Sequence, residues 1–132
     1  MDIPLTGPFA PLTVVLVDPD DLVRQSLTGL LGIGRRVEVV GSAGEVRAAL
    51  RLVGELQPDV IVVDPRLPEL PAGLAFIAEA RRLAPAAGVL VIGSAEVVAQ
   101  ATASDGVDGC IRKTFRPDEL TAAIVACRPA PG

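Results

Sequence analysis

The sequence predicts a single α/β domain built on a parallel sheet with helices on both faces. Runs of apolar, largely β-branched residues alternate five times with segments that carry apolar residues at helical spacing, within 132 residues. The central run, 60–63, is apolar at every position, which is typical of a strand buried on both faces of a sheet. Short connections between the runs favour parallel strands joined by right-handed crossovers.

The first two strand–helix units are predicted from the residues at their ends. Asp18 follows the first apolar run and suits the N-cap of a helix, and Pro19 suits its first turn. Gly32 and Gly34 end that helix, and Gly41 closes the second strand. The expected elements are strand 12–17, helix 19–31, strand 37–40 and helix 45–56.

Prolines and glycines divide the remaining three units. Pro65 stops the third strand, and a proline-rich loop runs through Pro71 to Gly73, where the third helix begins. Pro85 stops that helix and Pro117 starts the last one, while the fourth helix is rich in alanine and weak. The expected elements are strand 60–63, helix 73–83, strand 89–92, helix 96–103, strand 110–112 and helix 117–127.

Composition excludes several classes of function. The formal net charge is −4, which argues against a nucleic-acid surface because such a surface needs clustered Lys and Arg. No apolar run reaches the roughly 18–20 residues of a membrane span, and no signal segment opens the chain. Cys110 and Cys127 lack metal-ligand spacing and suggest reduced thiols. We therefore expect a soluble cytoplasmic domain over 12–127, a loose lead-in at 1–11, and a tail or linker stub at 128–132.

Charged and polar residues follow four of the predicted strands. In the flavodoxin-like strand order 2-1-3-4-5, strands one and three are neighbours, so Asp18 and Asp64 meet at the carboxyl edge of the sheet. Lys113 and either Gly93 or Ser94 border the same place. Two carboxylates a few ångströms apart repel by roughly 4 kcal/mol. A lysine, or a hard cation such as Mg²⁺, would relieve that repulsion.

Other functions of this architecture fit less well. A dinucleotide-binding domain needs a glycine-rich turn after the first strand, and the sequence there is Asp18-Pro19-Asp20-Asp21. A P-loop is absent, and a flavodoxin would need a hydroxyl-rich phosphate loop at the position of these acids.

With these motifs in view, the chain resembles the receiver domain of two-component response regulators over about residues 12–127. The likeness is carried by the acidic opening, by the strand that ends in Asp64 with its loop, and by the segment around Lys113. The matching residues are Val17-Asp18 with Leu22-Val23-Arg24, the run 58–64 with Leu67-Pro68, and the segments 106–109 and 113–120.

The resemblance implies a phosphorylated signalling domain rather than an enzyme. Asp64 would accept a phosphoryl group from a histidine kinase or phosphotransfer protein, and Lys113 would pair with Asp64 and then with the phosphoryl group. Asp18, Asp64 and the backbone carbonyl of Arg66 would hold Mg²⁺. The sequence after the acidic opening is most similar to regulators with a helix-turn-helix output domain, which this chain does not include.

Several positions depart from the family pattern, and they gather at the site. Pro19 replaces the second acid of the opening, and Asp20, one position further on, is a weak candidate ligand, so we expect weak Mg²⁺ binding. Gly93 stands where a hydroxyl residue is usual, and Ser94 substitutes only if the strand end is shifted. Cys110 replaces the switch aromatic of the fifth strand.

Two interpretations therefore stay open. In the first, the chain is an atypical receiver in which Asp64 is phosphorylated and a binding face changes. In the second, it is a pseudo-receiver, an interaction module in which Asp64 and Lys113 form a static salt bridge. The alanine-rich fourth helix and the last helix offer a surface for a homodimer in either case.

Overall fold

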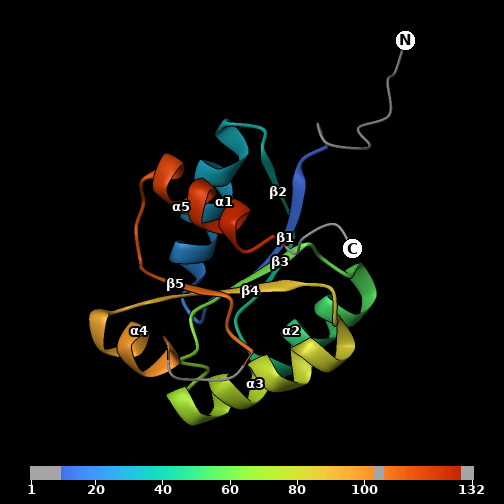
Figure 1. Ribbon diagram of the computed structural model, residues 1–132, viewed down its shortest axis with the longest axis vertical. Coiled ribbons are helices and arrows are strands. Elements are labelled where there is room, and N and C mark those ends of the chain that lie inside the picture. The colour runs from blue at the N-terminus through green and yellow to red at the C-terminus, as the bar shows by residue number, and fades with distance from the viewer. Residues whose placement is uncertain (1–9, 103–105, 129–132) are drawn as a thin grey trace.

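The computed structural model describes residues 10–102 and 106–128 and contains one parallel sheet (Figure 1). Its strands lie in the order β2-β1-β3-β4-β5, and every neighbouring pair is parallel, as the sequence predicted. The strands are β1 (Leu12–Val17), β2 (Val37–Ala43), β3 (Val60–Val63), β4 (Gly88–Gly93) and β5 (Gly109–Arg112). The helices are α1 (Asp21–Ile33), α2 (Val46–Leu56), α3 (Leu70–Leu83), α4 (Ala95–Thr102) and α5 (Pro117–Ala126).

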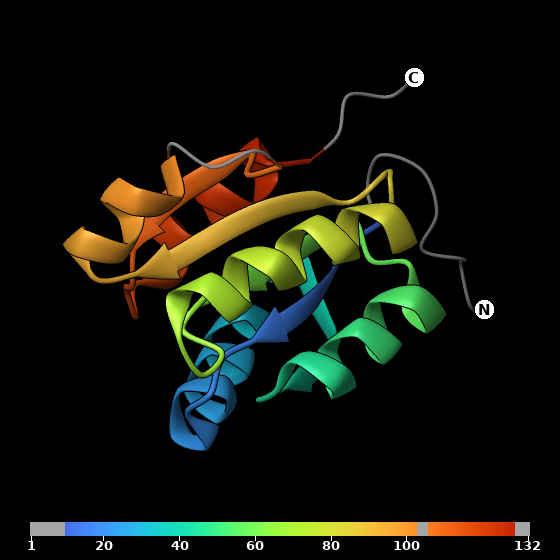
Figure 2. The ribbon, with the colours of Figure 1, turned by 90° about the horizontal axis from the view of Figure 1, so that it is seen from below.

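Helices cover both faces of the sheet and form two separate core clusters. Leucines and isoleucines of α1 and α5 pack on one face, and side chains of α2, α3 and α4 pack on the other (Figure 1). Viewed from below, α2 and α3 lie side by side across the same face (Figure 2). The described residues contain no helix long and apolar enough to cross a membrane.

Strand β3 supplies side chains to both clusters. Val60 and Val62 point into the cluster under α1 and α5, and Ile61 and Val63 point into the other. Each of the four residues is fully buried, because successive side chains of a strand alternate between its faces and both faces are covered. The unbroken apolar run therefore indicated a central strand correctly.

Two expected boundaries are wrong by three residues, and a glycine lies at each; helix α1 also begins and ends two residues later than expected and runs through Gly32 to Ile33. Strand β2 runs through Gly41 to Ala43 instead of ending at residue 40, because its pairing with β1 resumes at Gly41 after a register shift between Val14 and Val15. A Cβ at Gly41 would lie 3.0 Å from a methyl carbon of Leu56, so glycine lets α2 pack on this strand.

Helix α3 begins at Leu70 rather than at residue 73, with Pro71 in its first turn. A Cβ at Gly73 would lie 1.6 Å from the carbonyl oxygen of Pro65, so glycine is needed where this helix passes the loop after β3. The expected lead-in and tail fall almost wholly outside the described residues, as does the expected end of the fourth helix at Ala103.

Candidate functional site

Asp18 and Asp64 lie next to each other at the carboxyl edge of the sheet, as the strand order predicted. Asp18 follows β1 and Asp64 follows β3, and Val17 pairs with Val63 immediately before them. The backbone N–H of Asp64 donates to the carbonyl oxygen of Val17 at 2.9 Å, which extends the ladder to the acid itself. Asp18 is fully buried and Asp64 is 8% exposed, so both carboxylates are largely removed from water.

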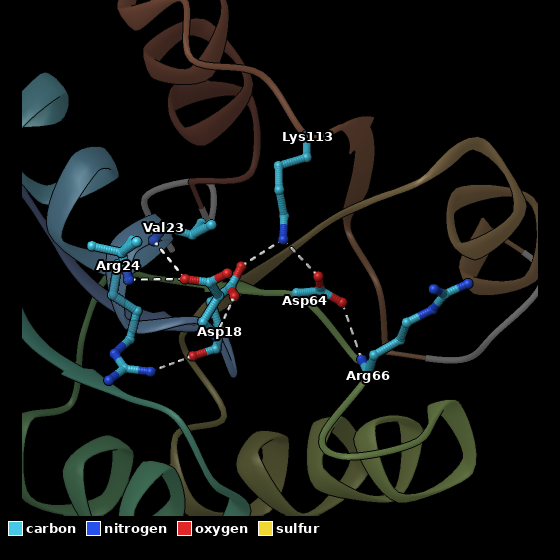
Figure 3. A network of polar contacts seen from close by, with 8 residues as sticks. Asp18, Val23, Arg24, Asp64, Arg66 and Lys113 are labelled. Atoms are coloured by element: carbon cyan, nitrogen blue, oxygen red, sulfur yellow. Dashed lines mark hydrogen bonds and ion pairs between the residues drawn. The ribbon is translucent and has the colours of Figure 1, made fainter.

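Lys113 places its ammonium group between these two carboxylates (Figure 3). Its Nζ lies 2.7 Å from Asp64 Oδ2 in a hydrogen bond. Nζ also lies 2.7 Å from Asp18 Oδ2, at ion-pair distance but without the alignment of a hydrogen bond. The backbone N–H of Lys113 donates to the carbonyl oxygen of Gly93 at 2.9 Å, so β4 fixes the point from which the lysine reaches the acids. The sequence had predicted this meeting from the strand ends.

The protonation state of Lys113 follows from these contacts. Burial alone would lower the pKa of the ammonium, but the close contact with Asp18, the hydrogen bond to Asp64 and the negative charges of both acids outweigh burial. The pKa of Lys113 is therefore raised above its ordinary value, and the ammonium stays charged at neutral pH. With two carboxylates and one ammonium, the cluster keeps a formal charge of −1.

Backbone N–H groups engage the other oxygens of the two carboxylates. Asp18 Oδ1 accepts from the N–H of Asp20 at 2.9 Å. Asp64 Oδ1 accepts from the N–H of Arg66 at 3.1 Å. Both acids therefore have one oxygen on the backbone and one on Lys113, which fixes their orientation.

Asp20, and not Asp18, is the N-cap of α1. Its Oδ1 accepts from the N–H groups of Leu22 and Val23 at 2.9 and 3.2 Å. The prediction of Asp18 as the cap is wrong because the Asp18 carboxylate lies against Lys113, three residues before the first residue of the helix. Asp20 is exposed and its Oδ1 accepts the capping hydrogen bonds, and its weak candidacy as a metal ligand stays a prediction.

Gly93 and Ser94, the candidates for contact with a phosphoryl group, both lie against Val97 at the start of α4. Ser94 Oγ accepts from the N–H of Val97 at 3.3 Å, at the start of this helix. A Cβ at Gly93 would lie 2.7 Å from Val97 Cγ1, so the Val97 side chain fills the space that a hydroxyl side chain would need.

Cys110 is half-buried on β5, opposite Val91, and packs against the core cluster under α3 and α4. Its proposed part as a switch position remains a prediction. Burial, with smaller contributions from Asp108 and Cys110, raises the pKa of Cys127 to about 11, so Cys127 stays an unreactive thiol at neutral pH.

The fit of a divalent cation follows from the oxygen atoms present. The part of the chain that the structure describes contains no group of three or more His, Cys, Asp or Glu arranged to hold a metal ion. Asp18 and Asp64 nevertheless offer two buried carboxylates, and Asp18 Oδ2 is buried without a hydrogen bond. Such oxygens suit a hard cation that keeps several waters. Pro19 offers no side-chain oxygen to a metal ion. The carboxylates of Asp18 and Asp64 are therefore the two side-chain donors that fit Mg²⁺ here.

Arg24, which the motif analysis quoted as part of the acidic opening without giving it a role, is a site residue. Its guanidinium Nη1 donates to the carbonyl oxygen of Asp18 at 2.6 Å (Figure 3). Its Nη2 pairs with Asp21. The sequence did contain a signal for the ion pair of Arg24, because residues three apart on a helix share a face and Asp21 and Arg24 have opposite charges.

A family model described as the response regulator receiver domain matches residues 14–125. Protein-glutamate methylesterase/protein-glutamine glutaminase 2 of Xanthomonas oryzae is 38% identical over 81 residues, which are 61% of this chain and 22% of that protein. The DNA-binding transcriptional activator DevR/DosR of Mycobacterium tuberculosis is 46% identical over 56 residues, 42% of this chain and 26% of that protein. The chain thus spans about a quarter of the length of the curated relatives it matches.

Solved structures agree over nearly the whole chain. The response regulator domain of Thermotoga maritima CheB has a TM-score of 0.74 and 26% identity, covering 89% of this chain and 96% of that one. A LuxR-family two-component response regulator from Aurantimonas sp. SI85-9A1 has a TM-score of 0.72 and 32% identity, covering 88% of this chain and 84% of that one.

Proposed function

This chain belongs to the response regulator receiver domain family, and we propose that Asp64 is its phosphoryl acceptor in two-component signalling. The observation that carries the proposal is the placement of the Lys113 ammonium 2.7 Å from both Asp64 and Asp18 at the carboxyl edge of the sheet. A largely buried carboxylate with a fixed cation beside it is suited to accept an anionic phosphoryl group.

In the proposed reaction, an oxygen of the Asp64 carboxylate attacks the phosphorus of a phosphohistidine on a kinase or phosphotransfer protein. A P–O bond forms and the P–N bond breaks, and its electron pair stays on the imidazole nitrogen, which takes up a proton. The product is an acyl phosphate on Asp64. This chain supplies the nucleophile and the partner supplies the phosphoryl group, so the domain acts as an acceptor rather than as an enzyme with a separate substrate.

Lys113 and the backbone of Arg66 orient the acceptor for this reaction. Asp64 accepts from Lys113 Nζ through Oδ2 and from the Arg66 N–H through Oδ1, so each oxygen of the carboxylate is held by a hydrogen bond. When the carboxylate becomes an acyl phosphate, its own charge is lost and the charge moves to the phosphoryl oxygens. The long Lys113 side chain, which is 24% exposed, can follow that charge outward.

Asp18, Asp64 and the backbone carbonyl of Arg66 are the groups that would hold Mg²⁺. When bound, the ion would neutralise phosphoryl charge during transfer. Binding is proposed to be weak because Pro19 lacks a ligand oxygen and Lys113 already occupies the place between the two acids. This weakness would make the reaction more dependent on Lys113.

The partners follow from the same proposal. A histidine kinase or phosphotransfer protein would donate the phosphoryl group in the cytoplasm, and an output domain would read the result. The methylesterase and DNA-binding activities named for the relatives belong to those longer proteins, of which this chain matches about a quarter. For this chain, direct binding of nucleic acid or membrane is not proposed.

Phosphorylation can be tested with a small-molecule donor. Incubation with acetyl phosphate and Mg²⁺ should add one phosphoryl mass, measured on the intact protein, and Asp64→Asn should abolish it. Asp59→Asn is a matched control, because the Asp59 side chain accepts from Thr13 at the opposite end of the sheet. Labelling that persists in Asp64→Asn, or a wild type that is never labelled by acetyl phosphate or a kinase, would contradict the proposal.

A further inference from the structure

Arg24 ties the start of α1 to the turn that carries Asp18 (Figure 3). Its Nη1 donates to the Asp18 carbonyl oxygen at 2.6 Å, and its Nη2 pairs with the exposed carboxylate of Asp21. The Arg24 side chain is only 18% exposed. A surface ion pair does not require such burial, so the contact with Asp18 is the one that draws the guanidinium inward.

Gly44 leaves the space that the guanidinium occupies. A Cβ at position 44 would lie 2.4 Å from Arg24 Nη1 and 3.4 Å from the carbonyl oxygen of Asp18. The guanidinium therefore lies between the segment after β2 and the turn after β1, and any larger residue at 44 would displace it. Arg24 and Gly44 are complementary, although they come from different strand–helix units.

The backbone of Asp18 is held on both sides by this arrangement. Its N–H donates to the carbonyl oxygen of Ala43 at 3.1 Å, and its own carbonyl accepts from Arg24. The buried Asp18 Oδ2 has no hydrogen bond of its own, so its place beside Lys113 depends on how firmly the residue is anchored elsewhere. The N–H of Asp20 donates to Asp18 Oδ1 and orients the carboxylate, and Arg24 anchors the Asp18 backbone without touching the carboxylate.

We propose that Arg24 is a positioning residue that fixes the backbone of Asp18, and thereby keeps the Asp18 carboxylate on Lys113 beside Asp64. Its effect on phosphoryl transfer rests on the proposed function, whereas its effect on the Asp18–Lys113 contact does not. A guanidinium suits this role because it can donate to a carbonyl and pair with a carboxylate at the same time.

Lys113 is the only lysine in the sequence, which gives a direct measurement. Lysine labelled with ¹³C at Cε gives one NMR cross-peak, whose chemical shift at pH 7 reports the surroundings of the Lys113 ammonium alone. Gly44→Ala should displace the guanidinium without changing any charge, because the clash falls on the flexible end of the Arg24 side chain. Arg24→Ala combined with Asp21→Asn removes the guanidinium and its partner charge together.

Both changes should move the Lys113 Cε cross-peak at pH 7 in the direction in which Asp18→Asn moves it, because the ammonium loses its contact with the Asp18 carboxylate. Adding Gly44→Ala to the double variant should change nothing further, since the displaced group is already gone. Asp21→Asn alone keeps the Arg24 contact with Asp18 and should leave the Lys113 cross-peak at its wild-type position. Arg82→Ala, which removes an exposed ion pair with Glu79 on α3, is the matched arginine control.

The proposal is overturned if Gly44→Ala and the double variant both leave the Lys113 cross-peak at its wild-type position, or if their effects on it simply add. Labelling of Asp64 by acetyl phosphate should also slow several-fold in both variants. If the wild type is labelled and the variants are labelled at the same rate, the proposed effect of Arg24 on phosphoryl transfer is overturned. If the wild type itself is never labelled, the proposed function fails, and the Lys113 cross-peak still decides whether Arg24 positions Asp18. If the double variant does not fold, Gly44→Ala decides alone.

Discussion

Replacing Lys113 by methionine should destabilise the domain without unfolding it. The substitution keeps most of the apolar stem and removes the ammonium, leaving Asp18 and Asp64 with no cation between them. Because each Oδ2 lies 2.7 Å from Nζ, the two oxygens cannot be farther apart than twice that distance. At that separation, two unit charges repel by roughly 3 kcal/mol for an effective dielectric constant near 20.

A loss of about 3 kcal/mol would leave a domain of ordinary stability folded, since such domains unfold at a cost of roughly 5–15 kcal/mol. The assay is urea denaturation at pH 7 followed by far-UV circular dichroism, because the sequence contains no Trp or Tyr for fluorescence. Arg112→Met is the matched control, since Arg112 is the exposed residue next to Lys113, and it should change stability by less than about 0.5 kcal/mol.

A second substitution separates repulsion from lost packing. Asp64→Asn in the Lys113→Met background removes one of the two facing charges and should recover most of the lost stability. The reasoning is refuted if Lys113→Met costs no more than Arg112→Met, or if Asp64→Asn deepens the loss. Either result would mean that the two acids do not depend on the ammonium for neutralisation.

Three further predictions concern the metal, the pH dependence and the packing of α4. Pro19→Asp should tighten Mg²⁺ at least several-fold, roughly 1 kcal/mol or more, in a calorimetric titration; equal affinities would mean that another group supplies the ligand. The raised pKa of Lys113 means that its ammonium adds stability below the ordinary value of 10.5, and that this stability is lost as pH rises through the raised value. The stability difference between wild type and Lys113→Met should therefore shrink above pH 10.5 in urea denaturation, and a difference that grows would contradict the assignment. Gly93→Ser should cost roughly 1–3 kcal/mol through overpacking against Val97; Val97→Ala should relieve part of that cost, and strict additivity in the double variant would show that the two positions do not compete for space.

The fold could be predicted from the sequence because its signals are local and redundant. The run 60–63 is apolar at every position, and a strand with that pattern is buried wherever it lies in a parallel sheet. Prolines and glycines predicted where most of the other helices and strands begin or end. The misplaced boundaries at Gly41 and Gly73 depend on close approach to Leu56 and Pro65, which are distant contacts that no local pattern contains.

The site was predictable to the extent that strand order determines it. Asp18, Asp64 and Lys113 each follow a strand, so topology alone brought them to one edge. The choice between Asp18 and Asp20 as helix cap was not predictable, because both are good caps and a tertiary contact with Lys113 decides between them. Likewise, the position of the Arg24 side chain depends on the space left by Gly44, which lies between β2 and α2.

The charge of the cluster links the resting site to its proposed reaction. At rest, two carboxylates share one ammonium and the net charge is −1. Phosphorylation would remove the charge of the Asp64 carboxylate and add a phosphoryl group of about −1.5 to −2, so the cluster would become more negative while Lys113 remains its single lysine. A cation that binds weakly at rest should then bind more tightly, and by reciprocity it should favour the phosphorylated form. Weak resting affinity for Mg²⁺ and a part for Mg²⁺ in phosphorylation are therefore compatible, because the demand for positive charge arises when the phosphoryl group arrives.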